Sequence, residues 1–222
     1  MKTVAIVPSA GHGKRLGAKD KKPFVLLGGK PLVSYALLAL DRCASIDGII
    51  IASEKSCVEK FITLIKRLGL RKVIDVVVGG KTRTISVRNC LRRADPSFGI
   101  VLIHDAARPF VDKKLIDKAV RTAKRTGACI SALPESDTVK LAGRDNVVKK
   151  TLDRRRVFRA QTPQAFRRDV IERAYAAAGR ASTTDDSGLA EKIGAKVSII
   201  EGTYRNIKIT TKEDLKLAEV LL

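Results

Sequence analysis

Four short, mainly apolar runs alternate with helical patterns between the start of the chain and residue 124. The runs at 4–7, 49–52, 73–78 and 100–103 suit strands, and those at 4–7 and 49–52 suit buried strands. Helical spacing follows each run, at 31–40, 55–68, 82–93 and 115–124. This order predicts a Rossmann-like three-layer α/β sandwich with a mostly parallel twisted sheet, which binds ligands at the carboxyl ends of its strands.

The pattern changes after a fifth predicted strand at 130–133. Short alternating segments at 139–141 and 147–151 flank a turn-forming sequence, which is typical of a β-hairpin. An isolated hairpin is marginally stable and needs a partner surface. We therefore expect residues 136–156 to project as an arm through which two copies form a homodimer.

The rest of the chain returns to mixed patterns. Helices are predicted at 164–178, 183–192 and 213–221, and short strands at 197–200 and 207–209. No linker or low-complexity stretch divides the chain, so residues 1–222 are expected to form a single domain with the arm attached.

A glycine-rich turn and a group of cations follow the first predicted strand. Pro8 ends strand pairing, and Gly11 and Gly13 allow the backbone to turn and to approach a ligand closely. The cations are Lys14, Arg15, Lys19, Lys21 and Lys22. Backbone amides and fixed positive charge together attract a polyphosphate. Leu16 stands where the dinucleotide fingerprint needs glycine, and Arg15 where the triphosphatase loop needs Ser or Thr. A different triphosphate loop and an ordinary surface turn both stay open.

Composition argues against several other classes of protein. The four cysteines are widely spaced with no Cys-x-x-Cys pair, so metal and redox sites lack their usual spacing. No apolar run approaches the roughly 18 residues of a membrane span, and no signal-peptide pattern is present, so we expect a cytoplasmic protein with no membrane partner. The net charge of +21 favours polyanionic ligands, but the cations are scattered and aromatic residues make up only 4%. Nucleic acid is therefore not expected as the main partner.

Five stretches together resemble the 2-C-methyl-D-erythritol 4-phosphate cytidylyltransferase family. They are PSAGHGKRL at 8–16, HDAARP at 104–109, DT at 137–138, AQTPQ at 160–164 and NIKIT at 206–210. The resemblance implies a fold similar to that of sugar-nucleotide pyrophosphorylases. It also implies transfer of CMP from CTP to 2-C-methyl-D-erythritol 4-phosphate, with Mg²⁺ and release of pyrophosphate.

The resemblance carries roles onto individual residues. Catalytic roles are implied for Arg15, Lys22, Arg154 and Lys208. Binding of CTP or of the acceptor is implied for Ala10, Gly11, Gly13, Gly80, Arg83, Ser86, Asp105, Arg108, Thr138, Thr162 and Thr184. Arg154 is expected to reach the acceptor phosphate of the neighbouring subunit. Asp105, at a strand end, is expected to contact the ribose or a Mg²⁺ ion, or to serve only as a turn or helix-cap residue.

This chemistry suits a site of cations without a nucleophilic side chain. The second pKa of a phosphate monoester lies near 6, so the attacking oxygen is already an anion and needs no general base. Preorganised Arg and Lys side chains hold two anions together and stabilise the charge that grows on the departing pyrophosphate.

Several alternatives stay open at this point. Lys21 could take the role of Lys22, and Arg155 that of Arg154, because each basic run allows a shift of one residue. The acceptor could be another polyol phosphate such as ribitol 5-phosphate. A basic RNA-binding domain without enzymatic activity is the alternative of another class. Residues 183–186 also fit a generic capping box.

Overall fold

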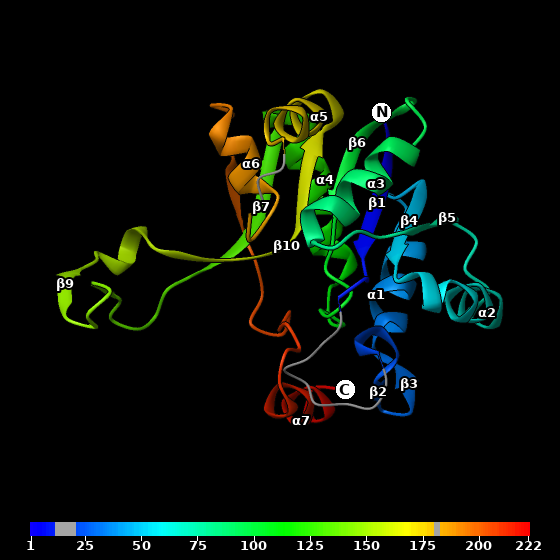
Figure 1. Cartoon of the computed structure of the whole chain (residues 1–222), viewed down its shortest axis with the longest axis horizontal. Coiled ribbons are helices and arrows are strands. Elements are labelled where there is room, and N and C mark those ends of the chain that lie inside the picture. The colour runs from blue at the N-terminus through cyan, green and yellow to red at the C-terminus, as the bar shows by residue number, and fades with distance from the viewer. Residues whose placement is uncertain (12–20, 180–182) are drawn as a thin grey trace.

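One seven-stranded sheet forms the centre of the molecule (Figure 1). The computed structural model describes residues 1–11, 21–179 and 183–222. In order across the sheet, the strands are β11 (Ser198–Glu201), β7 (Ala128–Pro134), β10 (Phe158–Arg167), β6 (Phe98–Ile103), β1 (Lys2–Pro8), β4 (Gly48–Ser53) and β5 (Val73–Val78). All run in one direction except β10, which is antiparallel to both β6 and β7. The predicted mostly parallel α/β sandwich is confirmed.

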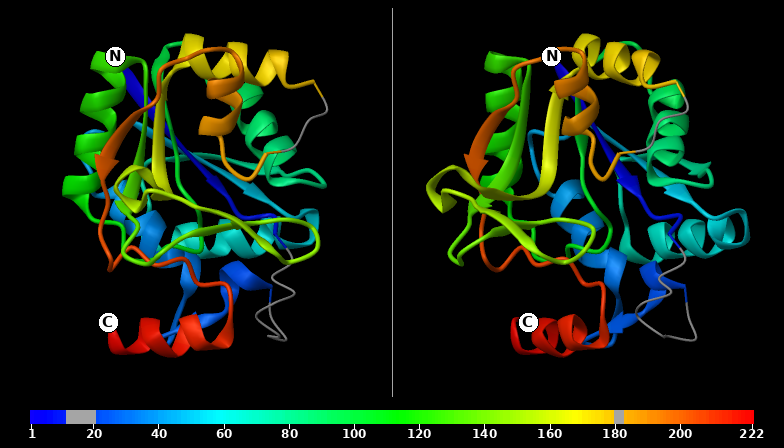
Figure 2. Two further views of the ribbon diagram at one scale, coloured as in Figure 1. Left: turned by 90° about the vertical axis from the view of Figure 1, so that its left-hand side faces the viewer. Right: turned by 60° about the vertical axis from the view of Figure 1, so that its left-hand side comes forward.

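Helices cover both faces of this sheet (Figure 2). On one face, α1 (Leu32–Asp41), α2 (Val58–Leu68) and α4 (Lys113–Thr126) pack on a buried apolar cluster that includes Leu37, Phe61 and Ile116. On the other face lie α3 (Arg83–Arg93), α5 (Arg168–Ala177) and α6 (Ser187–Lys192). Residues 4–7 of β1 alternate between the two clusters and are fully buried, which explains their unbroken apolar run.

Strand β10 corrects the sequence prediction. A helix was expected at 164–178, but residues 164–167 belong to β10 and α5 begins only at Arg168. Ala165 and Phe166 are fully buried, and both pair with β6 and β7. The polar Gln161 and Gln164 interrupt the apolar pattern of the strand, and pairing with distant strands overrides the local helical spacing.

The segment at 207–209 is a second correction, because it forms no strand. Ile209 donates its N–H to the carbonyl of Ala107 at 2.9 Å. Its side chain is fully buried in a third apolar cluster, together with Leu27 and Ala218. Ala218 belongs to α7 (Lys212–Val220), and Leu27 belongs to β2 (Leu26–Leu27), which pairs with β3 (Lys30–Pro31). This cluster holds residues 206–209 beside the loop that follows β6.

The predicted hairpin is present as β8 (Lys140–Ala142) and β9 (Val148–Thr151), which pair antiparallel. Asn146 has a left-handed φ of 58° in the turn. Every side chain in both strands is exposed, and the hairpin extends well away from the central sheet (Figure 1). The short helix η4 (Arg154–Arg156) lies at its base. Within the described ranges, none of the helices has the length and apolar character needed to cross a membrane.

Candidate active site

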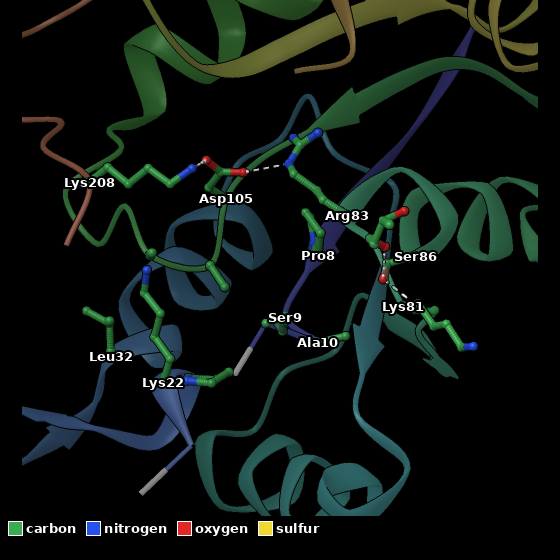
Figure 3. Close-up of a pocket in the computed structure, with 16 residues that line it drawn as sticks. Pro8, Ser9, Ala10, Lys22, Leu32, Lys81, Arg83, Ser86, Asp105 and Lys208 are labelled. Atoms are coloured by element: carbon green, nitrogen blue, oxygen red, sulfur yellow. Dashed lines mark hydrogen bonds and ion pairs between the residues drawn. The ribbon is translucent and has the colours of Figure 1, made fainter. Parts of the chain in front are cut away.

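A pocket of about 390 Å³ opens where β1 and β6 end and α3 begins (Figure 3). Its lining comes from three segments at the carboxyl ends of strands, and from three segments outside the sheet. The lining residues are Pro8, Ser9, Ala10, Gly11, Lys22, Pro23, Leu32, Gly80, Lys81, Thr82, Arg83, Ser86, Asp105, Ala106, Ala107 and Lys208. The parallel strand order therefore brings distant polar segments to one edge of the sheet.

The segment after β1 forms one wall of the pocket. Ser9 donates its N–H to the carbonyl of Ala52 at 2.7 Å, which extends the pairing of β1 with β4 by one residue. A side chain at Gly79 would collide with the Cβ of Ala10, at 2.5 Å, and with Ser86 Oγ, at 2.9 Å. Glycine at position 79 thus permits the close approach of the two walls. Gly13 and Arg15 lie outside the described residues.

The first turn of α3 forms the opposite wall. Thr82 caps this helix by accepting the N–H of Ile85 on its hydroxyl at 3.2 Å. The Ser86 hydroxyl donates to the carbonyl of Thr82 at 2.9 Å and accepts the N–H of Gly80 at 3.1 Å. These bonds fix the backbone around Gly80, and the positive end of the helix dipole faces the pocket. An anion is the ligand that such a wall favours.

Asp105 lies at the centre of a cluster of cations (Figure 3). Its carboxylate accepts from Lys208 Nζ at 2.7 Å and from Arg83 Nε at 3.2 Å, and Arg108 Nε lies 3.9 Å away. Burial acts to raise the pKa of Asp105, but Arg83 and Lys208 hold it well below its usual range. Asp105 is therefore ionised at neutral pH, and three cations surround one carboxylate.

Arg83 has a second partner that sequence reasoning missed. Its Nη1 atom lies 2.6 Å from Asp186 Oδ2, and the hydroxyl of Tyr175 donates to Asp186 Oδ1 at 2.5 Å. Asp186 is buried, which raises the pKa of its carboxyl group although Arg83 acts in the opposite direction. The capping box considered for 183–186 is wrong, because α6 begins only at Ser187 and the Thr183 hydroxyl donates to the carbonyl of Asp185. No local pattern signals a pairing between α3, α5 and α6.

Arg108 and Thr162 stand behind Asp105 and do not line the pocket. The Thr162 hydroxyl accepts the N–H of Asp105 at 3.0 Å, and Arg108 Nη1 donates to the carbonyl of Asn206 at 2.7 Å. The turn at 105–108 is closed by the N–H of Arg108, which donates to the carbonyl of Asp105 at 3.0 Å. Asp105 is thus a turn residue and a pocket residue at once.

Three other residues implied by the resemblance lie away from the pocket in a single chain. Thr138 and Arg154 belong to the arm, where Arg154 Nη1 donates to the carbonyl of Ser136 at 2.7 Å. Thr184 is exposed at the start of the α6 segment. A single chain therefore gathers in one pocket most of the described residues that the resemblance assigns to CTP, and Thr138, Arg154 and Thr184 lie outside that pocket.

The two candidate lysines differ in placement. Lys22, in the short helix η2 (Lys22–Phe24), lines the pocket, and Figure 3 shows its side chain there. Lys21 instead forms an ion pair with Glu54 at 2.9 Å. At the base of the arm, Arg155 pairs with Asp153 at 2.9 Å. The pocket lining includes Lys22 and not Lys21, which favours Lys22 for the role that the resemblance implies. Arg154 and Arg155 both have partners within the arm, so these contacts do not distinguish them.

Known proteins of one family match the chain over its whole length. The family model for 2-C-methyl-D-erythritol 4-phosphate cytidylyltransferase (IspD) matches residues 3–222. The 2-C-methyl-D-erythritol 4-phosphate cytidylyltransferase of Pelotomaculum thermopropionicum is 41% identical over 224 residues, which cover 100% of this chain and 94% of the relative. The corresponding protein of Geobacter metallireducens is 40% identical over 231 residues, with 100% and 98% covered.

Solved structures agree with this match. The 4-diphosphocytidyl-2C-methyl-D-erythritol synthase of Anaerococcus prevotii superposes with a TM-score of 0.87 at 32% identity, and the match covers 99% of this chain and 97% of that one. The 2-C-methyl-D-erythritol 4-phosphate cytidylyltransferase of Thermus thermophilus gives a TM-score of 0.79 at 29% identity, with 100% and 98% covered. By sequence and by fold, this chain belongs to the 2-C-methyl-D-erythritol 4-phosphate cytidylyltransferase family.

Proposed function

We propose that this chain transfers CMP from CTP to 2-C-methyl-D-erythritol 4-phosphate and releases pyrophosphate, as a step of isoprenoid precursor biosynthesis. An oxygen of the acceptor phosphate attacks the α-phosphorus of CTP. The bond from that phosphorus to the bridging oxygen breaks, and pyrophosphate leaves with the electron pair. The observation that carries the proposal is the pocket at the strand ends, where Arg83 and Lys208 converge on Asp105 in a chain of this family.

The pocket supplies what an anion-to-anion reaction needs. The positive end of α3, which faces the pocket, favours a phosphate chain. Lys22 and Lys208 line the same pocket, and we propose that both stabilise the charge that develops on the phosphates. Arg15, which follows β1 in the sequence and lies outside the described residues, is proposed to act with them. No general base is required, because the acceptor phosphate is already an anion.

We propose Mg²⁺ as the metal and Asp105 as its one protein ligand. The described residues contain no group of three His, Cys, Asp or Glu that could hold an ion by themselves. Mg²⁺ in nucleotide sites often takes one carboxylate together with phosphate oxygens and waters, so the ionised Asp105 fits this use. When bound, the ion would neutralise charge on the leaving pyrophosphate.

The assay for this function measures pyrophosphate release from each of the four nucleoside triphosphates. We expect release with CTP and 2-C-methyl-D-erythritol 4-phosphate, and much slower release with ribitol 5-phosphate as the acceptor. Faster turnover of ribitol 5-phosphate would assign the chain to the other polyol phosphate. No turnover with any triphosphate, together with tight and salt-sensitive RNA binding, would favour the non-enzymatic alternative.

The role of Lys22 has a matched control in the neighbouring residue. Lys22→Met is expected to lower kcat by about 10²–10³, as loss of one transition-state donor does in other enzymes. Lys21→Met changes the same side chain at a residue that pairs with Glu54 outside the pocket lining, and it is expected to retain most of the activity. Equal losses in the two variants would remove Lys22 from the mechanism.

We also propose one domain over residues 1–222, with the arm at 136–156 joining two copies. Support comes from exposed apolar side chains on the arm, Leu141, Val147 and Val148, and from the exposed Phe158 at the start of β10. Because a hairpin alone is marginal, a surface of this kind gains stability by packing on a partner. In such a dimer, Thr138 and Arg154 of one subunit would complete the site of its neighbour. A cytoplasmic location is proposed from the sequence alone.

Mixed subunits test this arrangement directly. If Lys22 and Arg154 serve one site from different subunits, Lys22→Met and Arg154→Ala are each nearly inactive alone. In a heterodimer of the two variants, one site keeps both native residues, so mixing after dissociation is expected to restore activity toward one quarter of wild type. No recovery, or a monomeric mass by light scattering, would contradict the shared site.

A further inference from the structure

The buried histidine at the end of β6 has no role in the chemistry described above. His104 is fully buried, directly precedes Asp105, and is not part of the pocket lining. An imidazole out of water is stable only if its ring nitrogens find partners. Both do: His104 Nε2 lies 3.1 Å from the carbonyl oxygen of Arg108, and Nδ1 lies 3.1 Å from Thr162 Oγ1.

These two partners allow one arrangement of the protons. The carbonyl of Arg108 can only accept, so His104 Nε2 must carry a hydrogen. The ring is fully buried and neither of its hydrogen-bond partners carries a charge, which favours a neutral ring with no hydrogen on Nδ1. Nδ1 therefore accepts, and the Thr162 hydroxyl donates to it.

The hydroxyl of Thr162 is thereby oriented for a second bond. With its hydrogen directed to His104, its lone pairs accept the N–H of Asp105 at 3.0 Å. The result is a hydrogen-bonded ring that runs from the Arg108 carbonyl through His104 and Thr162 to the Asp105 amide. It encloses the 105–108 turn, the segment that presents Asp105 to the pocket.

The same ring is tied to the segment that carries Lys208. The side chain of Asn206 donates from Nδ2 to the backbone carbonyl of Thr162 at 2.7 Å, and the backbone carbonyl of Asn206 accepts from Arg108 Nη1 at 2.7 Å. Two residues later, Lys208 contacts Asp105 at 2.7 Å. Three separate stretches of chain, after β6, in β10 and before α7, are thus fixed to one another behind the pocket.

We propose that His104 is a positioning residue, which through the hydrogen bonds of its two ring nitrogens orients Thr162 and the 105–108 turn so that Asp105 meets Arg83 and Lys208 in the pocket. The proposal rests on the proposed function for its kinetic consequence. Its geometric content, the proton arrangement, is independent of any activity.

Spectroscopy tests the geometric part without substrate. The chain contains two histidines, so long-range ¹⁵N–¹H spectra of wild type and of His12→Gln assign the His104 ring. We expect a hydrogen on Nε2 and a bare Nδ1 in the folded enzyme near neutral pH. A hydrogen on Nδ1, or a ring that exchanges between both forms, would overturn the proposal. This measurement stands even if no triphosphate is turned over, the outcome that would remove the proposed function.

Kinetics test the consequence for catalysis. His104→Phe keeps a planar ring and removes both bonds, and we expect kcat to fall on the order of 10²-fold, the cost of a misplacement of about 1 Å. His104→Gln retains a donor for the Arg108 carbonyl and is expected to recover part of kcat. Thr162→Val should resemble His104→Phe, and the double variant should lose little more than either single variant, because the residues act as one unit.

A stability control separates positioning from folding. Val120→Ala removes methyl groups from a nearly fully buried side chain of α4, in the cluster on the opposite face from α3, and should lower stability with kcat unchanged. All variants are assayed well below their melting temperatures. Wild-type kcat in His104→Phe, or additive losses in the double variant with Thr162→Val, would overturn the positioning role.

Discussion

Asp186 offers a sharp test of the ion network behind the pocket. In Asp186→Ala, Tyr175 loses the acceptor of its buried hydroxyl, and Arg83 loses a partner at 2.6 Å. An unsatisfied buried hydroxyl costs about 1–3 kcal/mol, and breaking a buried ion pair costs about 3–5 kcal/mol. Arg83 keeps Asp105 at 3.2 Å, and its side chain is 23% exposed, so the loss lies at the low end. We expect a decrease of about 3 kcal/mol in the free energy of unfolding.

Urea and thermal denaturation at pH 7 measure this loss. For a chain of this size, each 1 kcal/mol lowers Tm by about 2–4 °C, so about 3 kcal/mol corresponds to a decrease of roughly 6–12 °C. Asp153→Ala breaks an exposed pair with Arg155 and should leave Tm nearly unchanged. A loss below about 1 kcal/mol in Asp186→Ala, or one equal to that of Asp153→Ala, would refute the reasoning that burial makes this network costly to break.

Three further outcomes are expected. Gly80→Ala would place a Cβ against the side chain of Ile85 and overpack the pocket wall at a cost of about 1–3 kcal/mol. Calorimetry should then show CTP binding weakened about tenfold or more. An unchanged affinity for CTP would contradict the contact with Ile85. Phe61→Ala removes a fully buried ring and leaves a cavity, so the free energy of unfolding measured by urea denaturation should fall by about 3–5 kcal/mol. A loss under about 1 kcal/mol would contradict this expectation. Burial raises the pKa of Cys90 and Cys129 to about 12, so the unfolded chain loses these protons first. The contribution of each protonated thiol to the free energy of unfolding is fully present below about pH 9. As the pH rises toward 12, the free energy of unfolding should fall by up to about 1.4 kcal/mol per pH unit for each thiol, and its slope against pH should be flatter in Cys90→Ala and in Cys129→Ala.

Residues that follow the ends of strands were predicted better from the sequence than contacts between side chains that are distant in the sequence. Ala10, Gly80, Arg83 and Asp105 line the pocket because parallel strands deliver their carboxyl ends to one edge. Asp186 was read as part of a capping box, because a short local pattern cannot reveal a partner on α3.

Local patterns alone determined the alternation of strands and helices and the projecting hairpin, since each of these depends on residues within a few positions of one another. Tertiary structure alone decided that β10 enters the sheet antiparallel, and that His104 pairs with Thr162 across 58 positions of sequence. A buried polar group needs a hydrogen-bond partner, and the tertiary fold decides which residue takes that place. Neither the spacing nor the hydropathy of a segment indicates which residue that partner is.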